Sequence, residues 1–326
     1  MDNNILTNDN LELTPKTTYS DPVMKFDFPD VEVGIGEYDE GPTGCTVFYF
    51  PKGPANIAYN VGGGAPGTIL TRGLRQVDAI CFAGGAVLGL EATSGVMAEL
   101  LKKRNYSVGW DDIPSVSGAI IYDYLPRNNS IYPDRELGRA AFMALQKGVF
   151  PLGAQGAGRS ATVGKTMDMC CWESSGQGGA FMKIGDTRIA VFTLVNAMGA
   201  IIDRDGKVIR GHYNIPDDRR EGSLAYMLKS IENRKNGETA ETIKGNCTLT
   251  LAVTNQEFDR EELQFLAQQL NCSMARTIHP YHTMDDGDSV FVVSTGGVAN
   301  SGISLTEMGV LMSETAREAV LSAIPR

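Results

Sequence analysis

The sequence predicts a layered α+β fold, and three observations support this prediction. Strand-like and helix-like segments come in groups along the 326 residues, whereas a parallel, doubly wound sheet requires strict alternation of strands and helices. The strand-like segments show two-residue alternation or short apolar runs, and the helix-like segments carry apolar residues every three or four positions. The length fits one large domain or two ordinary ones.

The first half of the chain is predicted to hold strands, a glycine-rich loop and two helices. Val31, Val33 and Ile35 alternate with polar or small residues, which is typical of a half-buried strand. Residues 62–67 form a loop rich in glycine. Buried strands are also expected at residues 46–50, 79–82 and 119–122. The helices are expected from about residue 87 to 103 and from 134 to 147, with Gly148 ending the second.

The polar stretch in the second half separates two groups of elements. Strands are expected before it, at residues 189–195 and 200–203, followed by a hairpin turn at Asp205-Gly206. Residues 214–245 are polar and charged, and we interpret them as an exposed linker with at most one helix, near residues 224–231.

Regular structure resumes at Cys247. Leu249, Leu251 and Val253 alternate with smaller or polar residues, so a strand is expected to start there. Asp259 and Glu262 have the spacing of a capping box at a helix start. A further strand at residues 289–295 and a final helix at 305–322 complete the predicted elements.

Composition excludes several classes of function. The net charge is −10 and no basic block is present, so we expect no nucleic-acid partner. No apolar run reaches the length of a membrane span. Residues 1–22 are polar and lack the apolar region of a signal peptide, so we expect a flexible tail and a cytoplasmic protein. The six cysteines form no C-x-x-C pair, and we expect neither a metal nor a cofactor.

The linker meets a candidate nucleophile at Gly245-Asn246-Cys247-Thr248. A thiol there could attack the preceding carbonyl, shift the acyl group from nitrogen to sulfur, and leave a new amino terminus after hydrolysis. That α-amino group could then serve as the base for its own side chain, because its pKa of about 7.7–8.0 leaves part of it neutral near physiological pH. The plain alternative is that Cys247 only begins a strand.

Several motifs occur together in one order along most of the chain. They are Glu40-Gly41-Pro42-Thr43-Gly44, Gly63-Gly64-Ala65-Pro66-Gly67-Thr68, Gly84-Gly85-Ala86, Leu137-Gly138-Arg139-Ala140-Ala141, Gly156-Ala157-Gly158 and Gly245-Asn246-Cys247-Thr248. In these motifs the chain resembles the L-aminopeptidase/D-esterase family. From residues 26 to 44 it is most similar to the branch of endo-acting 6-aminohexanoate-oligomer (nylon oligomer) hydrolases.

This resemblance implies a four-layer αββα sandwich of the N-terminal-nucleophile hydrolase type. It also implies self-cleavage between Asn246 and Cys247 into a large chain (23–246) and a small chain (247–326) that stay in one structural domain. The processed heterodimers are expected to assemble as tetramers, to act on amides and to need no cofactor. The family nucleophile is Ser or Thr, so Cys247 is a departure, and Thr248 would point to the opposite sheet face.

The resemblance also assigns roles to residues far from the cleavage site. It implies that Lys165 lowers the pKa of nearby groups or orients the thiolate, and that Asn196 positions the nucleophile or stabilises the oxyanion. Tyr122 corresponds to a tyrosine at the oxyanion site, where one donor can contribute about 2.7–4 kcal/mol. Each also has a plain interpretation: a surface lysine, a turn asparagine and a core aromatic.

Two carboxylates, Asp286 and Asp288, match an Asp-Gly-Asp pair of the nylon-hydrolase branch. They could hold the new α-ammonium or Lys165 in place. The alternatives are an acidic turn or a calcium site, although the EF-hand spacing and its final Glu are absent. The three histidines, His212, His279 and His282, are expected to be structural. Neither a Gly-x-Ser-x-Gly elbow nor a phosphate loop is present.

The leading functional hypothesis is hydrolysis of linear oligoamides such as 6-aminohexanoate oligomers. The first alternative is an aminopeptidase or amidase acting on short peptides, β-peptides or D-amino acid amides; an N-capped oligoamide separates the two, since an aminopeptidase does not cut it. An acyltransferase and an unprocessed, non-catalytic oligomeric scaffold are further alternatives. Transfer of the acyl group to an added amine would identify an acyltransferase. A chain that stays whole would identify the scaffold.

Overall fold

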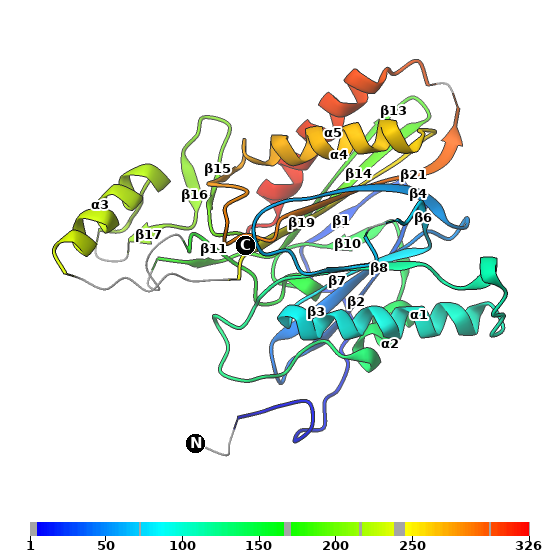
Figure 1. Ribbon diagram of the computed structural model, residues 1–326, viewed down its shortest axis with the longest axis horizontal. Helices are drawn as coiled ribbons and strands as arrows, with labels where there is room; N and C mark the ends of the chain where they lie inside the picture. Colours follow the sequence, from blue (N-terminus) through cyan, green and yellow to red (C-terminus); the bar gives the residue numbers. More distant parts are fainter. Residues whose placement is uncertain are drawn as a thin grey trace.

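The structure is a computed structural model of the 326-residue chain, and it describes residues 5–71, 73–165, 171–214, 217–237, 245–299 and 301–325. Two six-stranded sheets form its centre (Figure 1). The first sheet has the order β13 (Gln177–Ile184), β14 (Thr187–Asn196), β19 (Cys247–Gln256), β21 (Ser289–Val298), β4 (Ala55–Val61) and β6 (Gln76–Val77). The second has the order β5 (Thr68–Ile69), β8 (Val116–Ile120), β7 (Ala79–Ala83), β3 (Thr43–Tyr49), β2 (Glu32–Tyr38) and β9 (Gln146–Lys147).

Short strands complete the sheet structure. β1 (Val23–Lys25) pairs with β10 (Val149–Pro151), and β11 (Thr162–Val163) pairs with β12 (Glu173–Ser174). β15 (Ala200–Ile202) lies between β16 (Val208–Arg210) and β20 (Ile278–His279). β17 (Tyr213–Asn214) pairs with β18 (Arg219–Arg220).

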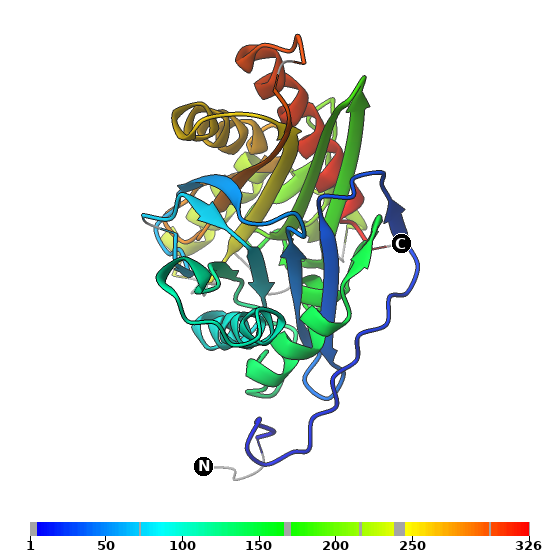
Figure 2. The ribbon, with the colours of Figure 1, turned by 90° about the vertical axis from the view of Figure 1, so that its right-hand side faces the viewer.

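The helices enclose the two sheets. α4 (Arg260–Met274) and α5 (Leu305–Ser322) pack on the outer face of the first sheet, and α1 (Glu91–Lys103) and α2 (Arg135–Met143) on that of the second (Figures 1 and 2). Between the sheets, the rings of Phe48 and Phe192 lie 5.0 Å apart and those of Phe82 and Phe291 lie 5.7 Å apart. Burial of this apolar surface is the main force that holds the layers together. The predicted α+β class and the αββα layering are confirmed.

Local signals account for several element boundaries. The expected capping box starts α4: Asp259 accepts a hydrogen bond from the amide of Glu262, whose side chain accepts one in return. Ser304 and Glu307 form a second capping box at α5. Such caps contribute about 1 kcal/mol each. The hairpin turn at residues 205–206 and the helix α3 (Ser223–Lys235) in the polar stretch are also confirmed.

Tertiary pairing overrides local preference elsewhere. The helix predicted from residue 134 to 147 ends at Met143, because Gln146 and Lys147 pair with β2 instead. α1 begins at Glu91, after a 3₁₀ turn from Ala86 to Leu90. The strands β4 and β13 were not predicted, because their residues show neither clean alternation nor a continuous apolar run.

The segment expected to be a flexible tail is partly docked on the body of the protein. Lys16 exchanges two main-chain hydrogen bonds with Glu37, both of 2.9 Å. The Tyr19 hydroxyl donates to the carbonyl of Val33, and the Ser20 amide donates to the Gln155 side chain at 2.8 Å. Over the ranges that the structure describes, no helix is both long and apolar enough to cross a membrane.

Candidate active site

Cys247 opens a central strand of the first sheet. β19 runs antiparallel to β14, where Cys247 lies opposite Asn196, and parallel to β21 on its other side. Only 3% of Cys247 is exposed. The strand expected to start at Cys247 is confirmed, and it places the thiol at the end of a strand where several loops meet.

Two of these loops are joined by main-chain hydrogen bonds. The glycine-rich loop at residues 62–67 packs on the acidic segment at residues 283–288. Gly62 donates to the Asp288 carbonyl at 2.8 Å, and Ala65 donates to the Asp286 carbonyl at 3.0 Å. A Cβ atom on Gly64 would lie 2.0 Å from the carbonyl oxygen of Met284, so this contact requires glycine. The loop at residues 62–67 therefore packs against the acidic segment at residues 283–288 and holds it in place.

The two carboxylates are buried, and each of their oxygens accepts hydrogen bonds. Asp286 accepts from the Thr283 hydroxyl at 2.6 Å and from the Met198 amide at 3.2 Å. Asp288 accepts from the Thr248 amide at 2.7 Å and from the His282 amide at 3.0 Å. These contacts fix the acidic segment to the start of β19 and give each carboxylate oxygen a protein donor. Within the described ranges, no group of three or more His, Cys, Asp or Glu is placed to bind a metal ion.

Lys165 and Asn196 form a second buried polar unit. The Lys165 ammonium nitrogen donates to the Asn196 side-chain oxygen at 2.9 Å and to its main-chain carbonyl at 3.2 Å. The Asn196 side-chain amide donates to the carbonyl of Tyr122 at 3.0 Å. Because Asn196 on β14 is paired with Cys247 on the neighbouring strand β19, this unit lies next to the thiol.

Burial shifts the acid–base properties of these groups. It lowers the pKa of Lys165 from 10.5 to about 7, against the opposite influence of Cys247, Asp286 and Asp288. Burial, together with the Asp286 carboxylate, raises the pKa of Asp288. Burial and the Asp288 charge raise the pKa of the Cys247 thiol to about 12. A lysine that is partly neutral near pH 7 therefore lies beside a thiol that holds its proton.

The bond before Cys247 is held by main-chain hydrogen bonds that sequence reasoning missed. Gly287 donates its amide to the carbonyl oxygen of Asn246 at 2.6 Å, and the Asn246 amide donates to the carbonyl of Asp285 at 3.3 Å. A Cβ atom on Gly287 would lie 2.7 Å from the Cys247 sulfur and 2.5 Å from the Ala65 oxygen. The one signal in the sequence is that glycine separates the two predicted carboxylates.

Tyr122 contacts this region through its ring and its main-chain carbonyl. Its side chain lies against Gly245, where a Cβ atom would approach the ring to 2.6 Å. Tyr122 is 38% exposed, whereas Lys165 and Asn196 are almost fully buried. The structure thus brings all the predicted site residues into one region. An oxyanion role for the Tyr122 hydroxyl stays a prediction.

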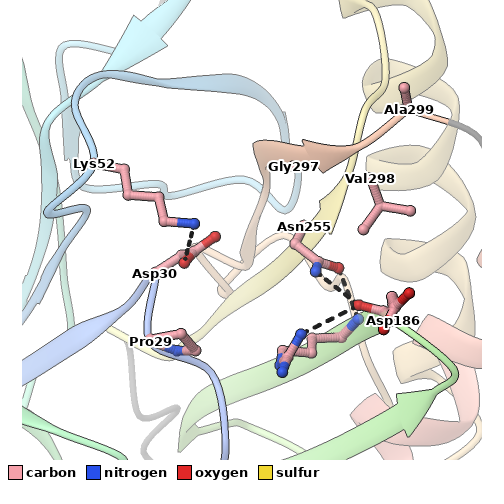
Figure 3. Close-up of a pocket in the computed structure, with 9 residues that line it drawn as sticks. Pro29, Asp30, Lys52, Asp186, Asn255, Gly297, Val298 and Ala299 are labelled. Atoms are coloured by element: carbon pink, nitrogen blue, oxygen red, sulfur yellow. Dashed lines mark hydrogen bonds and ion pairs between the residues drawn. The ribbon is translucent and has the colours of Figure 1, made fainter.

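A separate pocket of about 400 Å³ lies at the opposite end of β19, where Asn255 lines it (Figure 3). Several of its polar groups are held by protein contacts. Lys52 contacts Asp30 at 2.9 Å, and Asn255 bonds the main chain of Asp186 and Arg188 at 2.9 and 2.7 Å. None of the predicted site residues lines this pocket, so we do not assign it to the site at Cys247.

Comparisons with known proteins agree with the expected resemblance. Residues 26–325 match the family described as Peptidase family S58. The 6-aminohexanoate-oligomer endohydrolases of Agromyces sp. (strain KY5R) and Paenarthrobacter ureafaciens are each 39% identical to the chain, over 97% of its length and 90% of theirs. An uncharacterized aminopeptidase of Mycobacterium tuberculosis (strain ATCC 25618 / H37Rv) is 29% identical over 83% of this chain and 77% of its own.

Solved structures share the fold. A β-aminopeptidase of Burkholderia sp. superposes with a TM-score of 0.66 at 16% identity, covering 91% of this chain and 84% of its own. The L-aminopeptidase D-Ala-esterase/amidase of Ochrobactrum anthropi, described as a variant of the Ntn hydrolase fold, superposes with a TM-score of 0.67 at 13% identity. It covers 94% of this chain and 88% of its own.

Proposed function

Because this chain belongs to peptidase family S58 and is an amide hydrolase, we propose that it first cuts its own bond between Asn246 and Cys247. The observation that carries the proposal is the pairing of two groups at that bond. The carbonyl of Asn246 accepts a 2.6 Å hydrogen bond from Gly287, and the thiol of the next residue is buried beside the same glycine.

In the first step the Cys247 sulfur attacks the carbonyl carbon of Asn246. The carbonyl oxygen gains negative charge, and the Gly287 amide stabilises it there. Removing one such donor typically costs a factor of about 10²–10³ in rate. The carbon–nitrogen bond then breaks, the Cys247 nitrogen takes a proton, and a thioester joins the two parts of the chain. Water hydrolyses the thioester to a carboxylate at Asn246 and a free thiol on an N-terminal Cys247.

Lys165 is the proposed base for this step. The nitrogen of Cys247 is still an amide before cleavage and cannot accept the proton, so a side chain must do so. With the thiol pKa raised to about 12, only about one thiol in 10⁵ is ionised at pH 7. The proton must therefore leave as the sulfur attacks. Lys165, whose pKa is lowered to about 7, is neutral often enough to receive it.

After cleavage the new α-amino group of Cys247 takes over as the base. The thiol attacks a substrate amide, the amine leaves, and water releases the acid. In this proposal Lys165, Asn196, Asp286 and Asp288 hold the thiol and the α-amine in position, and the Gly287 amide and the Tyr122 hydroxyl donate to the oxyanion. The names of the relatives at 39% identity support 6-aminohexanoate oligomers as the substrate class.

We also propose that the processed units associate, as a tetramer. The helix α3 carries Leu224, Leu228 and Ile231 on one face, and these side chains are 68%, 58% and 40% exposed. An apolar stripe of this kind is typical of a contact surface. Replacing Leu224 and Leu228 with Ser should reduce the mass measured by sedimentation, and an unchanged mass would contradict the use of this surface.

Self-cleavage is tested on denaturing gels by intact mass and N-terminal sequencing. Wild-type protein should give chains 1–246 and 247–326, whereas Cys247→Ala should stay whole. Cys272→Ala, at an exposed cysteine, is the matched control and should still be cut. Amide hydrolysis by protein in which no chain begins at Cys247 would refute the proposal.

A further inference from the structure

The residue before the cut is held as if it belonged to a parallel sheet. Asn246 forms a parallel bridge with Asp286. Its amide donates to the carbonyl of residue 285, and its carbonyl accepts from the amide of residue 287. Both main-chain groups of one residue are thus used by the same neighbouring segment, which is the hydrogen-bond pattern of parallel strands.

We propose that the Asp285 carbonyl and the Gly287 amide form a subsite that binds the acyl residue of substrates once the chain has been cut. This inference rests on the proposed function, since Asn246 must leave the subsite before a substrate enters. The uncut segment is then the first acyl donor to occupy it, and its contacts describe what the subsite recognises.

The two hydrogen bonds define the chemistry of the preferred acyl residue. Only an α-amino acid residue carries an N–H and a C=O on the same carbon atom, so only such a residue can reach both groups as Asn246 does. In a 6-aminohexanoyl unit, five methylene groups separate the N–H from the carbonyl. That unit can accept the Gly287 hydrogen bond but cannot also donate to Asp285. The subsite therefore holds a peptide-like acyl group through two hydrogen bonds and a 6-aminohexanoyl group through one, so both are accepted and the peptide-like group is bound more firmly.

The next position along the acyl chain is restricted by Tyr122. Gly245 occupies it with φ of +89°, and a Cβ atom there would lie 2.6 and 2.8 Å from the Cγ and Cβ atoms of Tyr122. Glycine or an unbranched methylene chain fits beside this ring, whereas a side chain does not. This rule accepts oligomers of 6-aminohexanoate as well as peptides with glycine before the acyl residue.

Three N-capped 4-nitroanilides test the subsite on processed wild-type protein. The first has acetyl-Gly-Asn as its acyl part. The second has acetyl-Ala-Asn, and the third replaces the Asn N–H of the first with an ester oxygen. We expect kcat/KM to fall about fivefold to tenfold for the ester probe, the effect of one hydrogen bond. We expect at least a tenfold fall for the Ala probe, because its methyl group meets the Tyr122 ring.

The Tyr122→Ala variant separates the selectivity of the subsite from a general loss of activity. Tyr122→Ala removes the ring, so the ratio of kcat/KM between the Gly and Ala probes should approach one whatever the absolute activity, while the ester penalty remains. Equal kcat/KM for all three probes on the wild type would overturn the inference and leave the proposed function standing. So would cleavage of 6-aminohexanoate oligomers without cleavage of the first probe. Protein that neither cuts itself nor hydrolyses any amide would overturn both.

Discussion

Replacing Lys165 with methionine should stabilise the fold while removing the proposed base. Methionine fills a similar volume but carries no charge. We consider the change in a Cys247→Ala background, because there the chain stays whole and the unfolding of one chain can be analysed as a single transition. A gain in stability from the loss of an active-site residue is typical of sites that hold a group in an unfavourable environment.

The magnitude follows from the lowered pKa of Lys165. The drop from 10.5 to about 7 corresponds to about 5 kcal/mol for holding the ammonium in the buried site. At pH 7 about half of the folded protein carries neutral Lys165, so the penalty there is about 4 kcal/mol. The variant also loses the two hydrogen bonds to Asn196, which costs about 1–2 kcal/mol. We therefore expect a net gain of about 2–3 kcal/mol at pH 7.

The pH dependence provides a sharper test than the gain itself. The pKa of Lys165 is lower in the folded protein than in the unfolded chain, so the unfolded chain binds more protons between pH 7 and 10.5. The stability of the lysine form therefore rises with pH in this window. The advantage of Lys165→Met should be complete below pH 7 and should shrink by about 3 kcal/mol by pH 9.5.

Urea unfolding of the two proteins at pH 6, 7, 8.5 and 9.5 measures this difference. Lys183→Met, at a surface lysine that pairs with Asp27, is the control, and its effect should be small and nearly constant. If the difference in stability between the lysine form and Lys165→Met stays constant from pH 6 to 9.5, the reasoning is refuted, because burial then does not lower the pKa of Lys165.

Three further predictions concern the cleavage itself. Self-cleavage of newly refolded wild-type protein, followed on gels, should speed up as the pH rises through about 7, since neutral Lys165 takes the proton. Lys165→Met should stay whole. A cleavage rate that is flat from pH 5.5 to 8.5 would speak against a lysine base. Gly287→Ala should slow cleavage by at least about 100-fold, because its Cβ would crowd the thiol at 2.7 Å and displace the donor amide. Gly297→Ala, whose Cβ would meet its nearest neighbour at 3.8 Å, should be cut normally, and equal rates for the two variants would exclude the Gly287 role. Cys247→Ser should be cut at least about tenfold more slowly than wild type, because a hydroxyl is a weaker nucleophile than a thiol. Cys247→Ala should not be cut at all. Intact-mass time courses of the wild type and the two variants measure these rates.

Local patterns in the sequence were sufficient for much of the fold and for the strand start at Cys247. The two-residue alternation after Cys247 predicted β19, and the Asp259–Glu262 spacing predicted the start of α4, because both depend on residues close together in the chain. The resemblance to a known family named the side chains that the structure brings together around Cys247.

Other features depend on segments that are far apart in the sequence. The helix α2 ends early because residues 146–147 pair with β2, more than a hundred positions away. Local sequence left open a surface position for Lys165, and its burial against Asn196 is what lowers its pKa. The two hydrogen bonds around Asn246 involve main-chain groups, which almost every residue type carries. The sequence therefore indicates them only through the glycine between Asp286 and Asp288. The sequence by itself determined which residues can do chemistry, and only the tertiary structure decided their environment, because desolvation and main-chain contacts arise where distant segments meet.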